Sequence, residues 1–306
     1  MTETNLFEDA RWPRAGRWPS ADALGASEPV DVGIIGVPTW RTSLSATGAH
    51  ATPAAVRSAI QRYGTFAADA PWPSVADFGD VAEPDGDGEA DATDAVRRAS
   101  ARSSLVIALG GDNALTYSVA LGAWSSGAEN LVADAGLITI DAHHDLRDGV
   151  SNGSPVRRLL EAGLDGHRAV QLGIADFANS EFYDTRARDA GIRIVRRDEF
   201  EERPIEAIVT DALETAGASG GPIHVDVDVD ACDRSVAPAC PASIPGGLSA
   251  YQLRRTVRLL ARDPRVTSLD IAEVDATRDA ADGRTVRLAA LVVLEAIAGY
   301  AARSGA

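Results

Sequence analysis

Carboxylates and histidines recur at alternate positions in two short stretches of this sequence. One stretch reads Asp141-Ala142-His143-His144-Asp145, and the other carries Asp226, Asp228 and Asp230. Successive side chains of an extended chain point to opposite faces, so the first, third and fifth residues of each stretch share one face. Apolar residues precede both stretches, which places these carboxylates close to a core where an unpaired charge is costly.

A divalent cation would neutralise such a cluster. Its ligands would be carboxylate oxygens and an imidazole nitrogen without a thiolate, and this set suits Mn²⁺ better than Zn²⁺. The alternation turns His144 away from the shared face, so we expect that side chain to pack or to support a ligand. The two stretches therefore predict a manganese centre.

The elements that position these residues are predicted from the hydrophobic pattern. The expected strands are Val30–Val37, Ser74–Val81, Ser103–Leu109, Gly136–Asp141, Ala169–Gly173, Ile192–Val195, Pro222–Asp228 and Val266–Ile271. The expected helices are Thr52–Arg62, Asp94–Arg102, Leu115–Ser125, Pro155–Ala162, Ser180–Ala190, Pro204–Ala216, Ala250–Asp263 and Val286–Arg303. Continuous apolar runs are typical of strands buried on both faces of a parallel sheet. The alternation predicts an α/β fold of three α/β/α layers around a mostly parallel sheet of about eight strands, with ligands at the carboxyl ends of the strands.

One large domain is expected over residues 30–306, preceded by an N-terminal arm over residues 1–29 that has no clear periodicity. The acidic stretch Glu83–Thr93 is predicted to be a surface loop. No apolar run reaches the roughly 20 residues of a membrane span, and the N-terminus lacks the apolar core of a secretory signal. We therefore expect a cytoplasmic protein.

The charge of the chain is strongly negative. Its 29 basic residues are all arginine, its acidic residues number 45, and its formal net charge is −16. Such a surface repels nucleic acids and anionic membranes, so neither is an expected partner. Abundant carboxylates without lysine indicate adaptation to high salt, where ions screen the repulsion between them. A GC-rich genome that favours Arg, Ala and Asp is the alternative explanation.

The two cysteines, Cys232 and Cys240, follow the second acidic stretch. Their spacing fits no zinc or redox pattern, and a cytoplasmic compartment keeps thiols reduced. We interpret them as unreactive thiols, with proximity to a metal as the alternative.

Five motifs, in the same order along the chain, resemble those of the ureohydrolase (arginase-like) family. Residues 141–145 resemble its DAHxD motif and residues 224–233 its SxDxDxxDP motif. Residues 245–249 resemble its PGGLS-type turn, residues 110–113 its GGDH motif, and residues 48–57 its GxxxxPxAIR helix. The resemblance extends from about residue 30 to residue 300, so the arginase-like fold is expected.

The resemblance implies a binuclear manganese site in which activated water attacks an amidine-type carbon. The implied ligands are Asp141, His143, Asp145, Asp228 and Asp230, with Asp141 and Asp228 bridging the two ions. Glu273 has the position of the family's carboxylate that binds the cationic amidine or guanidinium of the substrate. The family also implies a homotrimer or homohexamer.

Asn113 has the position of a metal-binding histidine in the family's GGDH motif. Its amide oxygen is a neutral and weaker ligand than an imidazole nitrogen. The resemblance therefore implies two manganese ions per subunit, with Asn113 either completing the site of one ion or leaving that site weakened.

Other departures bear on the substrate. Arginases and agmatinases carry a proton-shuttling histidine where this chain has Asn152, whereas the segments 145–147 and 151–157 resemble formimidoylglutamases. Those enzymes convert N-formimidoyl-L-glutamate to L-glutamate and formamide in histidine breakdown. Arg147 and Arg157 are suited to bind the substrate's carboxylates. Asp145, Asn152 and Glu273 are the implied catalytic residues, and the last two also contact the substrate.

Two alternatives stay open. One is an agmatinase or guanidino-acid hydrolase, which would release urea. The other is a non-catalytic relative that kept the fold and lost a metal, and Asn113 is the feature that favours it. The retained carboxylates favour catalysis, because an inactive protein has no reason to keep buried charges together.

If the acidic composition is an adaptation to salt, the stability of the protein will depend on ionic strength. We expect the midpoint of thermal unfolding to rise between low and molar KCl, because the salt screens repulsion among the carboxylates. Circular dichroism at several KCl concentrations measures this midpoint. Equal midpoints at low and molar KCl would leave genome composition as the explanation.

Overall fold

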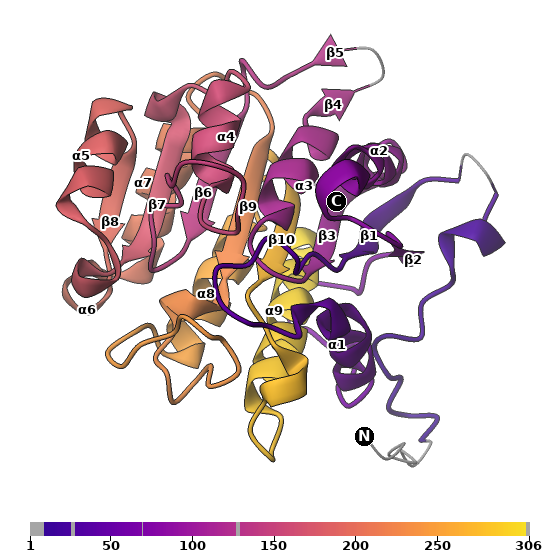
Figure 1. Ribbon diagram of the computed structural model, residues 1–306. Coiled ribbons are helices and arrows are strands. Elements are labelled where there is room, and N and C mark those ends of the chain that lie inside the picture. The colour runs from indigo at the N-terminus through magenta and orange to yellow at the C-terminus, as the bar shows by residue number, and fades with distance from the viewer. Residues whose placement is uncertain (1–8, 26–27, 69, 127–128, 304–306) are drawn as a thin grey trace.

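The strands of the protein follow the apolar runs of its sequence. The computed structural model describes residues 9–25, 28–68, 70–126 and 129–303, and its large sheet has eight strands that all pair in parallel (Figure 1). They are β1 (Val30–Val37), β2 (Val75–Asp80), β3 (Ser103–Gly110), β6 (Gly136–Ile140), β7 (Ala169–Ile174), β8 (Arg193–Arg196), β9 (Ile223–Asp228) and β10 (Val266–Ala272). Their order is β2-β1-β3-β10-β9-β6-β7-β8, so the predicted sheet is confirmed. A small antiparallel ribbon of β4 (Ser125–Ser126) and β5 (Glu129–Asn130) lies outside this sheet.

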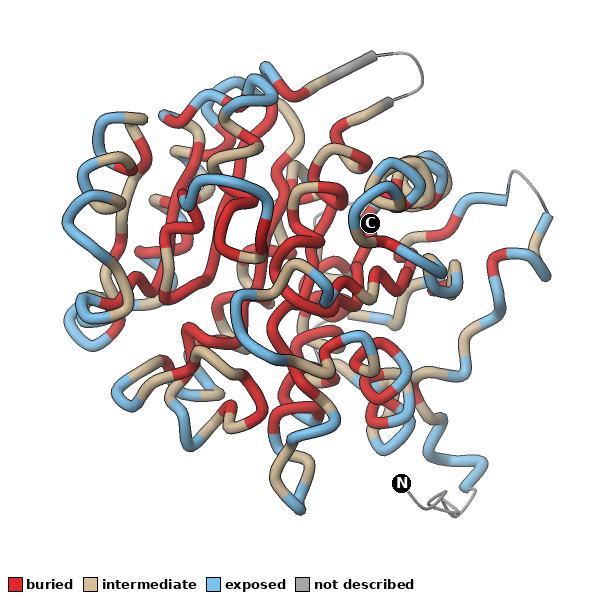
Figure 2. The backbone as a smooth tube through the Cα atoms, viewed as in Figure 1, coloured by how far each residue is buried: buried red, intermediate tan, exposed pale blue. Residues whose placement is uncertain are grey.

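Helices cover both faces of the sheet. They are α1 (Thr52–Ile60), α2 (Glu89–Ser100), α3 (Leu115–Ala123), α4 (Pro155–Glu161), α5 (Glu181–Asp189), α6 (Glu199–Glu202), α7 (Ile205–Ala216), α8 (Ala250–Leu260) and α9 (Arg284–Ala301). Alternate residues of β3 enter different cores: Leu105 and Ile107 join residues of α1, α7, α8 and α9, whereas Val106 and Ala108 join residues of α2 and α3. The three-layer α/β/α arrangement is therefore confirmed, and burial is greatest along the strands (Figure 2).

The start of helix α2 differs from the prediction. The sequence predicts a loop over residues 83–93, but α2 begins at Glu89. Glu89 and Asp91 lie in its first turn, where carboxylates interact favourably with the free N–H groups, and Ala92 is fully buried. The acidic residues that indicate a loop are thus the first turn of an amphipathic helix.

The segment before β1 runs along one end of the sheet. Of the expected arm, residues 1–8 and 26–27 lie outside the described residues. Ser20 pairs in parallel with Asp77 of β2, Arg14 pairs with Gly64, and Ala15 is fully buried in the core that contains α1. Residues 9–25 therefore pack against the domain.

The middle of the sheet positions the residues that could do chemistry. Strands β3, β10, β9 and β6 are neighbours, and the parallel arrangement brings their carboxyl ends to one side. The GGDN segment begins at the last residue of β3, Glu273 follows β10, Asp228 ends β9 and Asp141 follows β6. None of the described helices is long and apolar enough to span a membrane.

Candidate metal centre

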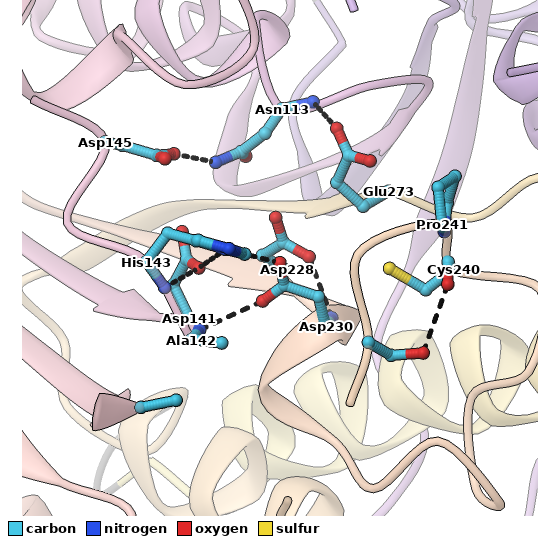
Figure 3. A network of polar contacts seen from close by, with 12 residues as sticks. Asn113, Asp141, Ala142, His143, Asp145, Asp228, Asp230, Cys240, Pro241 and Glu273 are labelled. Atoms are coloured by element: carbon cyan, nitrogen blue, oxygen red, sulfur yellow. Dashed lines mark hydrogen bonds and ion pairs between the residues drawn. The ribbon is translucent and has the colours of Figure 1, made fainter. Parts of the chain in front are cut away.

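A cluster of acidic side chains lies where these four strands end. Asp141, Asp228 and Asp230 are at most 3% exposed, and His143 lies beside them with its side chain 25% exposed (Figure 3). The Nδ1 atom of His143 lies 2.7 Å from Oδ2 of Asp230 and 3.5 Å from Oδ1 of Asp141. The structure therefore brings together Asp141 and His143 of the first stretch with Asp228 and Asp230 of the second.

Backbone N–H groups hold these carboxylates in place. The amide of His143 donates to Oδ1 of Asp141 at 2.6 Å, and that of Ala142 donates to Oδ1 of Asp230 at 2.9 Å. The amide of Asp230 in turn donates to Oδ1 of Asp228 at 2.8 Å. Oδ2 of Asp141 is buried without a hydrogen-bond partner. The cluster is thus fixed by the loop after β6 and the turn after β9, with an oxygen left for another ligand.

Burial and mutual repulsion disturb the protonation of the cluster. Burial, with the charges of neighbouring carboxylates, raises the pKa of Asp141 and of Asp228 well above the usual value. Burial alone would lower the pKa of His143, but the neighbouring carboxylates, Asp230 foremost with Asp145 and Asp228, outweigh it and raise that pKa to about 10. Although burial opposes it, His143 lowers the pKa of Asp230. Ionisation of Asp141 and Asp228 is therefore disfavoured unless a cation neutralises them, whereas the pair of His143 and Asp230 favours the charged form of each partner.

The donor set fits a divalent cation. Ligand atoms of Asp141, His143 and Asp230 lie within 4.8 Å of one another, and the same holds for Asp228, Asp230 and Cys240. Carboxylate oxygens with one imidazole nitrogen suit Mn²⁺. Asp230 belongs to both groups, so the two groups adjoin. The sequence pattern identifies the carboxylates and His143, whereas no spacing signal identifies Cys240.

Asn113 and Asp145 form the neighbouring part of the site. The amide nitrogen of Asn113 donates to Oδ2 of Asp145 at 2.5 Å, and its oxygen accepts from the hydroxyl of Thr116 at 2.9 Å. The oxygen and nitrogen of an amide are placed by their hydrogen bonds, and here the nitrogen faces the carboxylate. In this arrangement Asn113 orients Asp145 and does not turn its oxygen toward the cluster. Burial raises the pKa of Asp145 to about 7.

Glu273 is held by two donors on one of its oxygens. The backbone amide of Asn113 donates to Oε1 at 2.9 Å, and the side-chain amide of Asn152 donates to the same atom at 2.8 Å. The oxygen of Asn152 accepts from the amide of Leu44 at 3.0 Å. Asn152 therefore positions Glu273 and ties it to the loop after β1, and Oε2 of Glu273 is left for a ligand.

Two site residues have strained backbones. Among the described residues other than glycine, only Asp145 (φ 54°) and Glu273 (φ 62°) have positive φ. This region costs free energy for residues with a Cβ atom, and such strain concentrates at functional sites. The strained backbone at Asp145 and Glu273 indicates that the orientation of their carboxylates is maintained at some cost in the stability of the fold.

The two arginines expected to bind substrate lie in different environments. Arg147 is exposed and lines a cavity of about 300 Å³ together with His143 and Asp145. The guanidinium of Arg157 instead bonds to Glu161 and to the carbonyls of residues 147 and 149. Arg157 thus supports the loop that carries Arg147, and its guanidinium is already occupied.

Two of the four other histidines, His144 and His224, are buried and do not belong to the groups of ligand atoms. His144 points away, as the alternation predicts, and its Nδ1 lies 2.6 Å from Oε1 of Gln171. The two nitrogens of His224 lie 2.8 Å from Oγ of Ser268 and 3.0 Å from Oδ2 of Asp270. Both histidines are buried and support the layer beneath the site.

Removal of metal should make the stability of the protein sensitive to pH. The folded-state pKa of Asp145 is about 7, above the unfolded value near 4, so its stabilising contribution is present below pH of about 4 and is lost as the pH rises through about 7. We expect chelator-treated protein to lose thermal stability over this range. Added Mn²⁺ binds only the folded state, so it should raise the unfolding midpoint more at a pH of about 8 than at about 5.

Thermal unfolding of the wild type and of Asp228→Asn, with Mn²⁺ or chelator, measures this effect. Asp148→Asn is the control, because Asp148 is exposed and bonds to Arg186 away from the cluster. An equal Mn²⁺ response in the wild type and Asp228→Asn would contradict a metal centre at these residues.

Several known proteins are similar to this chain in sequence. The Arginase family model matches residues 30–299. The chain is 31% identical to formimidoylglutamase of Bacillus subtilis (strain 168), covering 92% of this chain and 89% of the relative. It is 34% identical to formimidoylglutamase of Halobacterium salinarum, with 91% and 88% covered. It is also 31% identical to guanidinopropionase of Pseudomonas aeruginosa, with 97% of each chain covered.

Solved structures agree with this relationship. The crystal structure of Bacillus subtilis formimidoylglutamase superposes with a TM-score of 0.87 at 28% identity, covering 98% of this chain and 96% of the other. The structure of Trypanosoma cruzi formiminoglutamase with Mn²⁺ has a TM-score of 0.79 at 25% identity, with 90% and 94% covered. Together with the acidic cluster at the strand ends, these matches show that the chain belongs to the arginase family.

Proposed function

We propose that the protein hydrolyses N-formimidoyl-L-glutamate to L-glutamate and formamide. The observation that carries this proposal is that Arg147, an exposed residue, lines a cavity together with His143 and Asp145, and relatives of the chain are named formimidoylglutamase. A glutamate-derived substrate carries two carboxylates, and a guanidinium can bind one of them with two parallel hydrogen bonds. Agmatine has no carboxylate and would gain nothing from Arg147.

The cofactor of the proposed reaction is manganese, held by Asp141, His143, Asp145, Asp228 and Asp230. When bound, manganese lowers the pKa of water, so that a nucleophile is available near neutral pH. We propose two ions per subunit, with the ion nearer Asn113 bound more weakly because that residue turns its amide nitrogen toward Asp145.

The other residues bind and orient the amidine. Oε2 of Glu273 pairs with the cationic amidine, while Asn113 and Asn152 fix Oε1. Asp145 takes the proton of the attacking water and delivers it to the nitrogen of glutamate. The C–N bond to that nitrogen then breaks, and the carbon leaves as formamide. Asn152 thus positions Glu273, and it stands where arginases and agmatinases carry a histidine that shuttles protons.

The proposed setting of the enzyme follows from composition and family. We propose a cytoplasmic, salt-adapted homotrimer or homohexamer that binds neither nucleic acid nor membranes. The net charge of −16 supports the last point, because it repels polyanions.

A guanidino-acid hydrolase is the second candidate. The similarity to guanidinopropionase over 97% of each chain favours it, and a guanidino acid also carries a carboxylate for Arg147. The two reactions differ in product, since a guanidino acid releases urea and an amidine releases formamide.

A product assay separates these functions. The Mn²⁺-loaded enzyme in molar KCl is offered N-formimidoyl-L-glutamate, 3-guanidinopropionate, agmatine and arginine in parallel. We expect formamide from the first substrate and no urea from the others.

Arg147→Gln should raise KM by about 10- to 100-fold with a smaller change in kcat, because a charged hydrogen bond to substrate is lost. Arg98→Gln on α2 is the control, since Arg98 is exposed and pairs with Asp94. In the product assay of the wild type, release of urea from 3-guanidinopropionate alone would establish the guanidino-acid hydrolase.

Substitution of Asn113 tests the metal count. We expect Asn113→His to bind the second manganese ion at least about tenfold more tightly, because an imidazole nitrogen is a stronger ligand than an amide. Calorimetric titration of metal-free protein gives affinity and stoichiometry. Asn113→Ala, which removes the hydrogen bond to Asp145 without adding a ligand, is the matched control. Identical binding by wild type and Asn113→His would contradict a weakened site.

A further inference from the structure

The thiol of Cys240 lies at the acidic cluster, although the proposed reaction does not use it. Its Sγ atom and the carboxylate oxygens of Asp228 and Asp230 are all within 4.8 Å of one another, and all three residues are buried. Figure 3 shows the sulfur pointing toward the two aspartates. Two ligands that are each about 2.3 Å from one cation are at most about 4.6 Å apart, so small movements of these side chains let one ion bind all three atoms.

The segment that carries Cys240 is fixed on both sides. The guanidinium of Arg234 donates to the carbonyl of Cys240 at 2.8 Å, and the hydroxyl of Ser243 donates to the same carbonyl at 3.1 Å. The carbonyl of Ala239 accepts from the amide of Asp275 at 3.0 Å, and the amide of Ala239 donates to the hydroxyl of Thr285 at 3.1 Å. The thiol therefore faces the cluster in a preformed position.

An independent feature of the cluster also indicates a ligand. Oδ2 of Asp141, a residue 1% exposed, has no hydrogen-bond partner, and its neighbour Asp230 belongs to both groups of ligand atoms. A buried carboxylate oxygen without a partner is costly unless a cation completes it. The thiol of Cys240 thus lies beside buried carboxylates whose negative charge attracts cations.

We propose that Asp228, Asp230 and Cys240 bind a thiophilic divalent cation, such as Cd²⁺ or Zn²⁺, in competition with manganese. Manganese prefers oxygen and imidazole ligands, whereas a thiolate selects softer ions. Binding replaces the S–H proton of Cys240, which is released to solvent, and forms one sulfur–metal bond without a change of oxidation state. The proposal rests on the metal centre of the proposed function and adds a second mode of occupation, in which a softer ion holds both aspartates.

Cadmium provides a direct test, because a cadmium–thiolate bond absorbs in the ultraviolet. Metal-free protein, kept reduced with a phosphine, is titrated with Cd²⁺ and the sulfur-to-metal absorption is recorded. We expect a saturable band in the wild type and its loss in Cys240→Ser and Cys240→Ala. Cys232→Ser is the matched control: Cys232 is equally buried but does not belong to either group of ligand atoms, so this variant should keep the band. Circular dichroism verifies that each variant is folded.

Competition tests the shared aspartates. Prior addition of Mn²⁺ should move the Cd²⁺ titration to higher concentration, since both ions use Asp228 and Asp230. No band in the wild type, a band that persists in both Cys240 variants, or a titration unaffected by Mn²⁺ would overturn the inference. Manganese binding is measured separately by calorimetry. Protein that binds Mn²⁺ without a Cys240-dependent Cd²⁺ band refutes only this inference, whereas protein that binds no Mn²⁺ refutes the proposed centre.

Discussion

The cost of gathering carboxylates in a buried place governs the structure of this site. Asp141, Asp228 and Asp230 lie almost without solvent at the ends of adjacent strands, and each disfavours ionisation of the next. His143 relieves the repulsion only in part, because its single positive charge faces several acids. A cluster of this kind is stable with a bound cation, or with protons retained where the cation would be.

The surroundings of the cluster consist of groups that orient without adding charge. Backbone amides hold the aspartates, and the amides of Asn113 and Asn152 hold Asp145 and Glu273. Neutral donors keep a carboxylate in place and leave its charge available to a cation or to a cationic substrate. The positive φ values of Asp145 and Glu273 serve the same end, since each turns a carboxylate out of the regular path after its strand.

Features of the fold and of the site that depend on local periodicity can be predicted from the sequence. The parallel sheet follows from continuous apolar runs, and the shared face of Asp141 and His143 follows from the twofold period of extended chain. Contacts between distant segments leave no local pattern. The bond from Asn113 to Asp145 spans 32 residues, and the approach of Cys240 to Asp228 depends on how a long loop returns to the sheet. The start of α2 was missed for a different reason, because acidic residues are typical both of loops and of a first helical turn.

The path of residues 9–25 has a consequence for how copies of the chain meet. An open strand at the border of a sheet exposes unpaired peptide groups that can recruit another chain and begin aggregation. At β2, the pairing of Ser20 with Asp77 covers part of that border (Figure 1). At the opposite border, β8 is only four residues long, and Arg193 and Arg196 form ion pairs with Asp211 and Asp176. Both borders are therefore guarded against edge-to-edge association, one by a neighbouring segment of chain and the other by brevity and charge.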